Sequence, residues 1–85
     1  SYNSPVPRFI RTHIEKDPEG SPTPTSDIYE QYQSFMENIP STPASRSKLT
    51  ERLKNQFEDH GYGRHRIGGK QVRGFDNIHI RHDSL

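Results

Sequence analysis

Residues 62–75 read YGRHRIGGKQVRGF, and this stretch decides the fold class of the chain. Two arms with alternating side chains, residues 62–67 and 70–75, flank the dipeptide Gly68-Gly69. Two glycines between alternating arms are typical of a tight β-hairpin, because glycine adopts the positive φ angles that such turns require. Gly74 interrupts the second arm and predicts a bulge. Alternation at Ile78 and Ile80 predicts one more short strand.

Upstream of the hairpin, the N-terminal part of the chain predicts one short helix. A proline near its start, at Pro5, is tolerated in a first helical turn. Apolar residues at helical spacing then extend the helix to about Lys16. Residues 1–5 are expected to form a flexible N-terminus. The proline-rich residues 17–25 predict an extended loop that holds at most one very short strand.

A second helix is indicated by an apolar stripe on one helical face. The stripe consists of Ile28, Tyr29, Tyr32, Phe35, Met36 and Ile39. Candidate N-caps are Thr25, Ser26 and Asp27, and Asp27 with Glu30 has the spacing of a capping box. Asn38 and Pro40 are expected to end the helix, and its aromatic residues are expected to lie in the core.

A third helix is predicted over residues 45–60. Leu49, Leu53 and Phe57 form its buried stripe, and the opposite face is rich in hydrogen-bonding side chains. Gly61 stands where a left-handed residue commonly follows a helix.

This element order predicts one α+β domain over residues 1–85, with the architecture of a winged helix. Two helices joined by a short turn and followed by a β-hairpin form a helix-turn-helix with a wing. Residues 45–60 would be the recognition helix, and residues 62–81 the wing. The core is small, so we expect modest stability.

The net charge of only +1 conceals an uneven distribution along the chain. Residues 1–44 hold three basic and six acidic side chains, a net charge of −3, whereas residues 45–85 hold nine basic and five acidic ones, a net charge of +4. Charge asymmetry of this kind indicates a polyanionic partner for the basic half. We therefore expect double-stranded DNA to bind the C-terminal half, with the acidic half turned away from it.

Candidate DNA-binding residues lie on both elements of that half. On the predicted recognition helix they are Arg46, Ser47, Lys48, Thr50, Glu51, Lys54 and Asn55, whose side chains suit base edges or phosphates. On the predicted wing they are Arg64, Arg66, Lys70 and Arg73, which would contact phosphates and make binding salt-dependent. His65 and His79 are expected beside phosphates, where protonation would be favoured.

Three motifs resemble a known family. They are the run Asp27-Ile28-Tyr29-Glu30-Gln31-Tyr32, the series Ser45-x-x-x-Leu49-x-x-x-Leu53, and His60-Gly61-Tyr62 before a basic hairpin that contains Gly74. Over residues 6–81 the chain is similar to the C-terminal winged-helix domain of phage, plasmid and viral primase–helicases of the D5-like or P4-alpha-like type. The resemblance implies DNA binding, often origin recognition, beside separate primase and helicase domains. The acidic first half and Glu51 depart from the more basic family pattern.

Other functions find little support in the sequence. The chain has no cysteine, so it lacks a thiol nucleophile and a cysteine-based zinc site. It has no phosphate-binding GxxxxGK[ST] loop, and we expect no enzyme activity, no cofactor and no metal. A mean hydropathy of −1.15 and short apolar runs indicate no membrane segment, and we expect an intracellular location, cytoplasmic or nuclear. Because Ser1 is not a start methionine, the chain reads as a fragment.

The expected partners are double-stranded DNA and the other domains of a parent replication protein. A homo-oligomer that forms through the parent protein is compatible with the sequence. Two alternatives remain open at this point. In the first, the domain binds a partner protein through its acidic half and its aromatic helix. In the second, it binds single-stranded or forked DNA by stacking bases on Tyr62 or Phe75.

Overall fold

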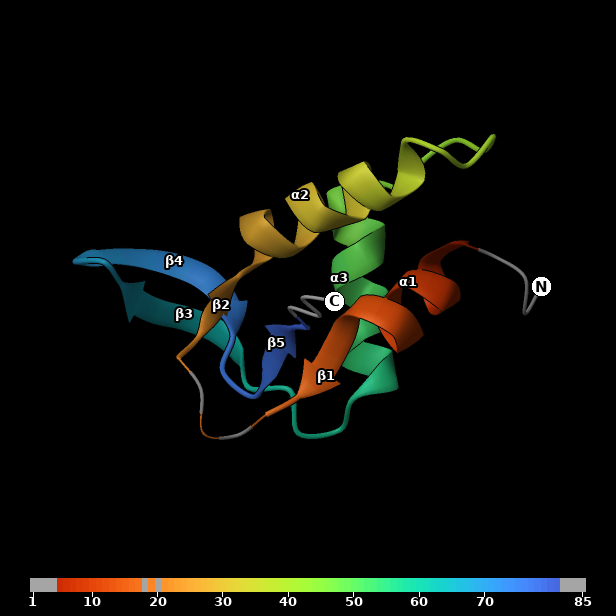
Figure 1. The fold of residues 1–85 in the computed structure, drawn as a ribbon. Coiled ribbons are helices and arrows are strands. Elements are labelled where there is room, and N and C mark those ends of the chain that lie inside the picture. The colour runs from red at the N-terminus through yellow and green to blue at the C-terminus, as the bar shows by residue number, and fades with distance from the viewer. Residues whose placement is uncertain (1–4, 18, 20, 82–85) are drawn as a thin grey trace.

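The computed structural model describes residues 5–17, 19 and 21–81. Its elements are α1 (Pro5–His13), β1 (Ile14–Lys16), β2 (Thr23–Pro24), α2 (Thr25–Met36), α3 (Arg46–Gln56), β3 (Tyr62–Ile67), β4 (Lys70–Phe75) and β5 (Ile78–Ile80) (Figure 1). The chain is thus an α+β domain with three helices and small antiparallel sheets, which is compatible with a winged helix. Of the expected flexible N-terminus, residues 1–4 lie outside the described residues, and Pro5 already begins α1.

Five strands form two antiparallel sheets among the described residues. The first sheet pairs β1 with β5, and the second has the order β2-β4-β3. Ile14 lies opposite Ile80 in the first sheet, so segments near the two ends of the chain are held together. The predicted wing, residues 62–81, is therefore too long: β5 belongs to the other sheet, and the hairpin itself ends at Phe75.

The predicted hairpin is confirmed, with both strands and the turn at the expected residues. Gly68 and Gly69 have φ angles of 60° and 82°, which explains why glycine occupies both turn positions. The bulge predicted at Gly74 is wrong, because β3 and β4 pair residue for residue, with Gly63 opposite Gly74. Gly74 instead accommodates the backbone of β2, the antiparallel neighbour of β4, which lies very close to it at Thr23 and Pro24.

The first helix ends three residues before the predicted boundary at Lys16. The reason is tertiary: Ile14, Glu15 and Lys16 pair with Ile78, His79 and Ile80. Ile14 is nonetheless buried, as its apolar spacing indicated. The very short strand anticipated in the proline-rich segment is confirmed as β2, which pairs with the end of β4.

The second helix has the predicted position but a different N-terminus. Pro24 is its N-cap residue, and no side chain caps the first turn, so the capping box predicted at Asp27 and Glu30 is wrong. The helix ends at Met36, before Asn38. Its buried face consists of Ile28, Tyr32 and Met36.

The third helix begins as expected, because the Ser45 side chain accepts a hydrogen bond from the backbone N–H of Lys48 at 3.2 Å. It ends at Gln56, earlier than the predicted His60, with Phe57 in extended conformation. Gly61 has a φ angle of 68° but lies well beyond the helix end, so it is not the residue that terminates α3. Its carbonyl accepts a hydrogen bond from Asp76 N–H, which ties the start of β3 to the end of β4.

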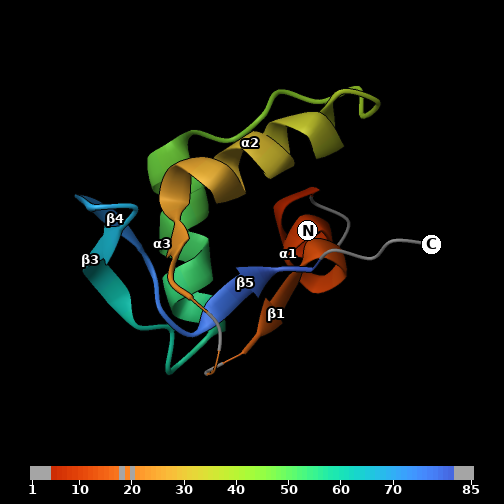
Figure 2. The same ribbon diagram turned by 60° about the vertical axis from the view of Figure 1, so that its left-hand side comes forward.

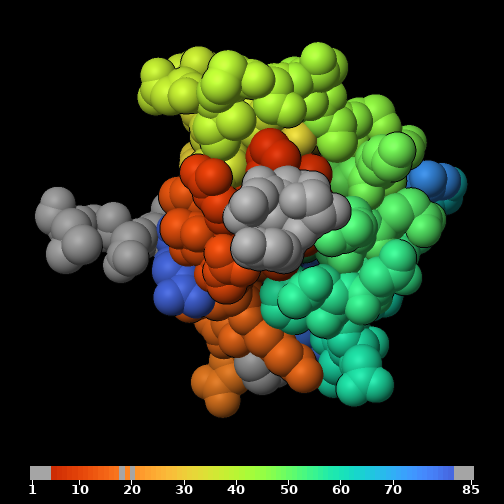
Figure 3. All heavy atoms as spheres, turned by 90° about the vertical axis from the view of Figure 1, so that its right-hand side faces the viewer, coloured from red at the N-terminus to blue at the C-terminus, as the bar shows by residue number. Residues whose placement is uncertain are grey.

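A single core joins all three helices to both sheets. The buried apolar residues are Phe9, Ile10, Ile14, Ile28, Tyr32, Met36, Leu49, Leu53, Phe75 and Ile78. Two views show α2 crossing α3 steeply, with α1 and the β1–β5 sheet closing the core beside them (Figures 1 and 2). The hairpin projects from one side of the body (Figure 1). On the opposite side, α1 and α3 lie next to each other at the surface (Figure 3). Within the part of the chain that the structure describes, no helix is long and apolar enough to cross a bilayer.

Candidate nucleic-acid interface

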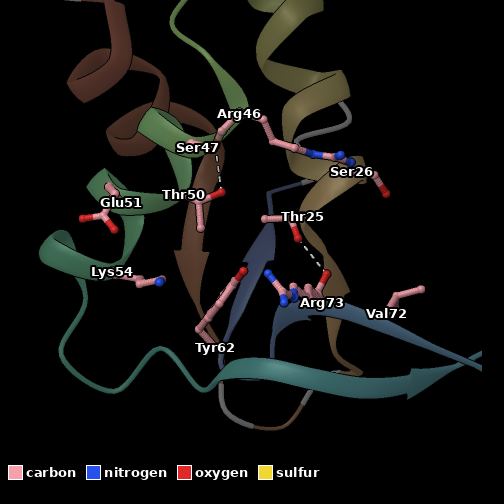
Figure 4. A pocket seen from close by; sticks show the side chains of 10 residues that line it. All are labelled: Thr25, Ser26, Arg46, Ser47, Thr50, Glu51, Lys54, Tyr62, Val72 and Arg73. Atoms are coloured by element: carbon pink, nitrogen blue, oxygen red, sulfur yellow. Dashed lines mark hydrogen bonds between the residues drawn. The ribbon is translucent and has the colours of Figure 1, made fainter.

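A groove with a volume of about 490 Å³ lies between α3, the first turn of α2 and the base of the hairpin (Figure 4). Residues from these three places line it: Thr25 and Ser26; Arg46, Ser47, Thr50, Glu51 and Lys54; and Tyr62, Val72 and Arg73. We call it the helix–hairpin groove. It brings together five of the seven candidate residues of α3 with one candidate of the hairpin.

The two remaining candidates on α3, Lys48 and Asn55, do not line the groove. Both are exposed, on a part of the helix surface outside the groove. Thr50 lines the groove, but its hydroxyl donates a hydrogen bond to the carbonyl of Arg46 at 2.8 Å. The candidates on α3 therefore divide into a set that faces the hairpin and a set that does not.

Lys54 is the most constrained cation of the groove. Its side chain is half-buried, and Nζ lies 4.2 Å from the centroid of the Tyr62 ring. A cation over an aromatic face is attracted by the ring quadrupole, which holds it in place without neutralising its charge. The Tyr62 ring also packs against Phe75, with 5.0 Å between the ring centroids.

The hairpin register sorts the basic residues of the hairpin onto two faces. Arg64 lies directly opposite Arg73, and Arg66 lies opposite Gln71, so these three arginines share one face. Lys70 lies opposite Ile67 and alternates to the other face. All four basic side chains are exposed. The structure therefore aligns Arg64 and Arg66 with Arg73, which reaches the groove, and separates Lys70 from them.

Among the described residues, no basic side chain of this surface forms an ion pair. Across residues 5–17, 19 and 21–81, the one ion pair joins Arg81 to Glu15, at 3.9 Å and away from the groove. Glu51 and Glu58 lie near Lys54 in sequence, yet neither pairs with it. The helix–hairpin groove and the adjacent hairpin face thus carry uncompensated positive charge, which suits an anionic ligand.

Four residues that line this groove were not among the candidates for duplex binding: Thr25, Ser26, Tyr62 and Val72. Of these, Tyr62 was considered only for base stacking. Thr25 and Ser26 were interpreted as helix caps, but Thr25 Oγ1 instead donates a hydrogen bond to the carbonyl of Arg73 at 2.7 Å. The signal that could have found them is Gly74. A glycine inside a strand marks a close backbone approach as well as a bulge, and here β2 approaches and delivers Thr25 to the hairpin.

The histidines have mainly internal partners. His79 uses both ring nitrogens, with Nδ1 2.9 Å from the Thr23 hydroxyl and Nε2 2.8 Å from the carbonyl of Asp17. Both ring nitrogens of His79 therefore have partners within the domain, contrary to the expectation that this side chain lies beside phosphates. His65 Nε2 lies 2.8 Å from the carbonyl of Gly61. No group of three or more acidic or histidine residues in the described ranges could hold a metal ion.

A second hollow, of about 560 Å³, lies on another side of α2. Asp27 and Glu30 form its acidic wall, and Pro22, Pro24 and Ile80 are among its apolar lining residues. None of the described residues that line it is a lysine or an arginine. The two hollows thus differ in charge, as the two halves of the sequence do.

The fold and the groove define a small α+β domain that presents uncompensated basic residues between a helix and a hairpin. A family model described as "Poxvirus D5 protein-like" matches residues 1–83, nearly the whole chain. The chain therefore belongs to this family of D5-type proteins. The likeness to D5-like proteins noted from the sequence motifs is thereby confirmed. Neither a curated protein nor a solved structure matches the chain significantly.

Proposed function

We propose that this domain is a non-catalytic winged-helix module that binds double-stranded DNA on behalf of a D5-type replication protein. In this proposal α3 is the recognition helix and enters the major groove, while the hairpin is the wing and follows the phosphate backbone. The domain would correspond to the C-terminal winged-helix domain of primase–helicases and would serve origin or template recognition. The parent protein would supply any catalytic activity.

The observation that carries the proposal is the helix–hairpin groove. Arg46 and Lys54 from α3 line it together with Arg73 from β4, although they are far apart in sequence. Arg64 and Arg66 extend the same cationic face along the hairpin. A cationic surface that extends from a helix onto a hairpin suits the phosphate backbone of DNA better than a compact ligand.

A fluorescence-anisotropy titration with labelled duplex DNA tests the proposal. At about 50 mM salt the domain should bind, and the affinity should fall steeply toward about 200 mM salt. If about five phosphates are neutralised, log K should fall with log salt with a slope near −4 to −5. Absence of binding at the lower salt concentration, or binding that salt does not change, would refute the proposal.

A protein-binding role is the second candidate, and the acidic hollow favours it. Asp27 and Glu30 have no cationic partner among the described residues, and the surrounding proline and isoleucine side chains offer apolar contact area. A basic segment of a partner protein would complement this surface. Both roles are compatible in one domain, because the acidic hollow and the helix–hairpin groove share no lining residue.

Binding of single strands by base stacking has less support. Stacking requires an exposed aromatic face, but Phe75 is fully buried. The Tyr62 ring is half-buried, with Lys54 over one face. A single-stranded competitor of equal length in the same titration separates this alternative from duplex binding.

A further inference from the structure

Two cations of the helix–hairpin groove converge on the same space. Lys54, Tyr62 and Arg73 point toward one another, and Arg46 reaches across the groove toward Ser26 (Figure 4). Like charges repel, so convergence without a carboxylate between them is unfavourable unless an anion is bound there. Glu51 lines the groove as well, but its side chain points away from Lys54 and Arg73 (Figure 4).

Contacts that leave the charges available hold the Lys54 side chain and the backbone that carries Arg73. Tyr62 supports Lys54, with 4.2 Å between Nζ and the ring centroid. Arg73 is fixed through its backbone, because the hydroxyl of Thr25 donates to its carbonyl at 2.7 Å. The adjoining pair, Pro24 opposite Gly74, anchors the same part of β4 to β2. A cation that is already ordered, as Lys54 is here, loses less conformational entropy when a ligand binds.

The groove also explains why the candidate residues on α3 fall into two sets. Arg46 and Lys54 face the hairpin, whereas Lys48 and Asn55 are exposed outside the groove. A helix that lies in the major groove is flanked by phosphate backbone and has base edges in front of it. The side of α3 that faces the hairpin would then meet backbone, and the outer side would meet bases.

We infer that the helix–hairpin groove binds a phosphodiester of the DNA backbone, with Arg46, Lys54 and Arg73 as its cationic ligands. Thr25 is a positioning residue that acts through Arg73. Base reading falls to Asn55 and Lys48 on the outer side of α3. This inference rests on the proposed function. It assigns phosphate contact to one side of α3 and base reading to the other side.

The DNA titration with three variants tests the division. Arg73→Ala should weaken two unrelated duplexes equally, by roughly tenfold, and should reduce the magnitude of the salt slope by about 1. Arg11→Ala, which removes the same charge from exposed α1, is the matched control and should leave the affinity nearly unchanged. Asn55→Ala should instead change the ratio of the two affinities and leave the salt slope unchanged.

Thr25 is tested by Thr25→Val, which keeps the side-chain shape but removes the donor. The affinity should fall several-fold, and the magnitude of the salt slope should decrease as well, as expected if Arg73 is displaced. Thr25→Ser should restore both the affinity and the slope. A loss of stability alone would lower the melting temperature without changing the salt slope. Should Arg73→Ala and Thr25→Val both behave as Arg11→Ala does, the groove is not a phosphate site, even if the domain binds DNA.

Inorganic phosphate tests the groove independently of DNA. In ¹H–¹⁵N spectra of the domain, added phosphate should shift the amide signals of Thr25, Ser26, Arg46 and Arg73 more than an equal ionic strength of chloride does. Arg73→Ala should abolish these shifts. If duplex DNA fails to bind but the shifts occur, the proposed function is wrong and the anion site stands. Shifts scattered over the whole surface would overturn the site.

Discussion

The backbone of Gly74 passes so close to the backbone of Thr23 that a Cβ atom on Gly74 would lie 2.9 Å from the carbonyl carbon of Thr23. Backbone cannot move aside as the end of a flexible side chain can. This contact sets the distance between β2 and β4, and with it the position of Thr25 over Arg73. A residue without a side chain thus holds one wall of the helix–hairpin groove in place.

Gly74→Ala should therefore destabilise the domain by about 1–3 kcal/mol, because β2 must shift to make room for the methyl group. Chemical denaturation measures the loss. Gly63→Ala is the matched control: Gly63 lies directly opposite Gly74, and a Cβ there would meet nothing within 4 Å. Equal losses in the two variants would show that the close approach to Thr23 is not the cause.

Tyr32→Phe should cost about 1–2 kcal/mol of unfolding free energy. The Tyr32 hydroxyl accepts a hydrogen bond from the backbone N–H of Ala44 at 2.8 Å, and the side chain is only 1% exposed. Removing the acceptor leaves that N–H without its partner in the turn between α2 and α3. Tyr62→Phe, whose hydroxyl has no hydrogen-bond partner among the described residues, should cost much less. Thermal denaturation of the two variants distinguishes them.

Arg64→Thr should slightly stabilise the domain and weaken its binding to DNA. Arg64 lies directly opposite Arg73, and like charges in that arrangement are destabilising by a few tenths of a kcal/mol. Threonine also suits a strand better than many residues do. Arg66→Thr gains only the second effect, because Arg66 lies opposite Gln71. A melting temperature for Arg64→Thr no higher than that for Arg66→Thr would contradict the prediction.

His79→Ala should loosen the connection between β1 and β2. The His79 ring links the Thr23 hydroxyl to the Asp17 carbonyl, at 2.9 and 2.8 Å. Without it, amide hydrogen exchange at Asp17 and Thr23 should accelerate, and the domain should lose about 1 kcal/mol of stability. Gln31→Ala, an exposed residue of the same hollow, serves as the control and should leave both amides unchanged.

The parts of the fold that the sequence predicted well are those decided by neighbouring residues. The hairpin has a glycine pair between alternating arms, and both strands have their predicted boundaries. The third helix also begins where it was predicted, with Ser45 as its N-cap residue. In each case the determining contacts span only a few residues, so local propensity and geometry are sufficient.

The errors arise where a distant segment overrides local preference. Helical spacing carried α1 past Ile14, but pairing with β5 draws residues 14–16 into a strand. The polar side chains at Thr25 and Asp27 predicted a cap, yet the Thr25 hydroxyl bonds to Arg73, which is 48 residues away. No local pattern contains such information.

The candidate site was predictable in composition but not in arrangement. Charge along the chain indicated the basic half, and the helix and hairpin supplied the right types of residue. Which residues meet depends on how α3 lies against the hairpin. That geometry places Arg73 and Lys54 on the same groove and leaves Lys48 and Asn55 outside it. The rotation of a helix about its own axis relative to a distant strand depends on core packing, which no spacing rule encodes.

The pairing of Ile14 with Ile80 has a consequence for the order of folding. Contacts between segments far apart in sequence form slowly, because a long loop must close before they contribute stability. The turn at Gly68-Gly69 closes a short loop, so the hairpin can form early. Every residue that lines the helix–hairpin groove precedes β5, which is the last strand along the described part of the chain. We therefore expect the hairpin to form early in folding and the pairing of β1 with β5 to form late.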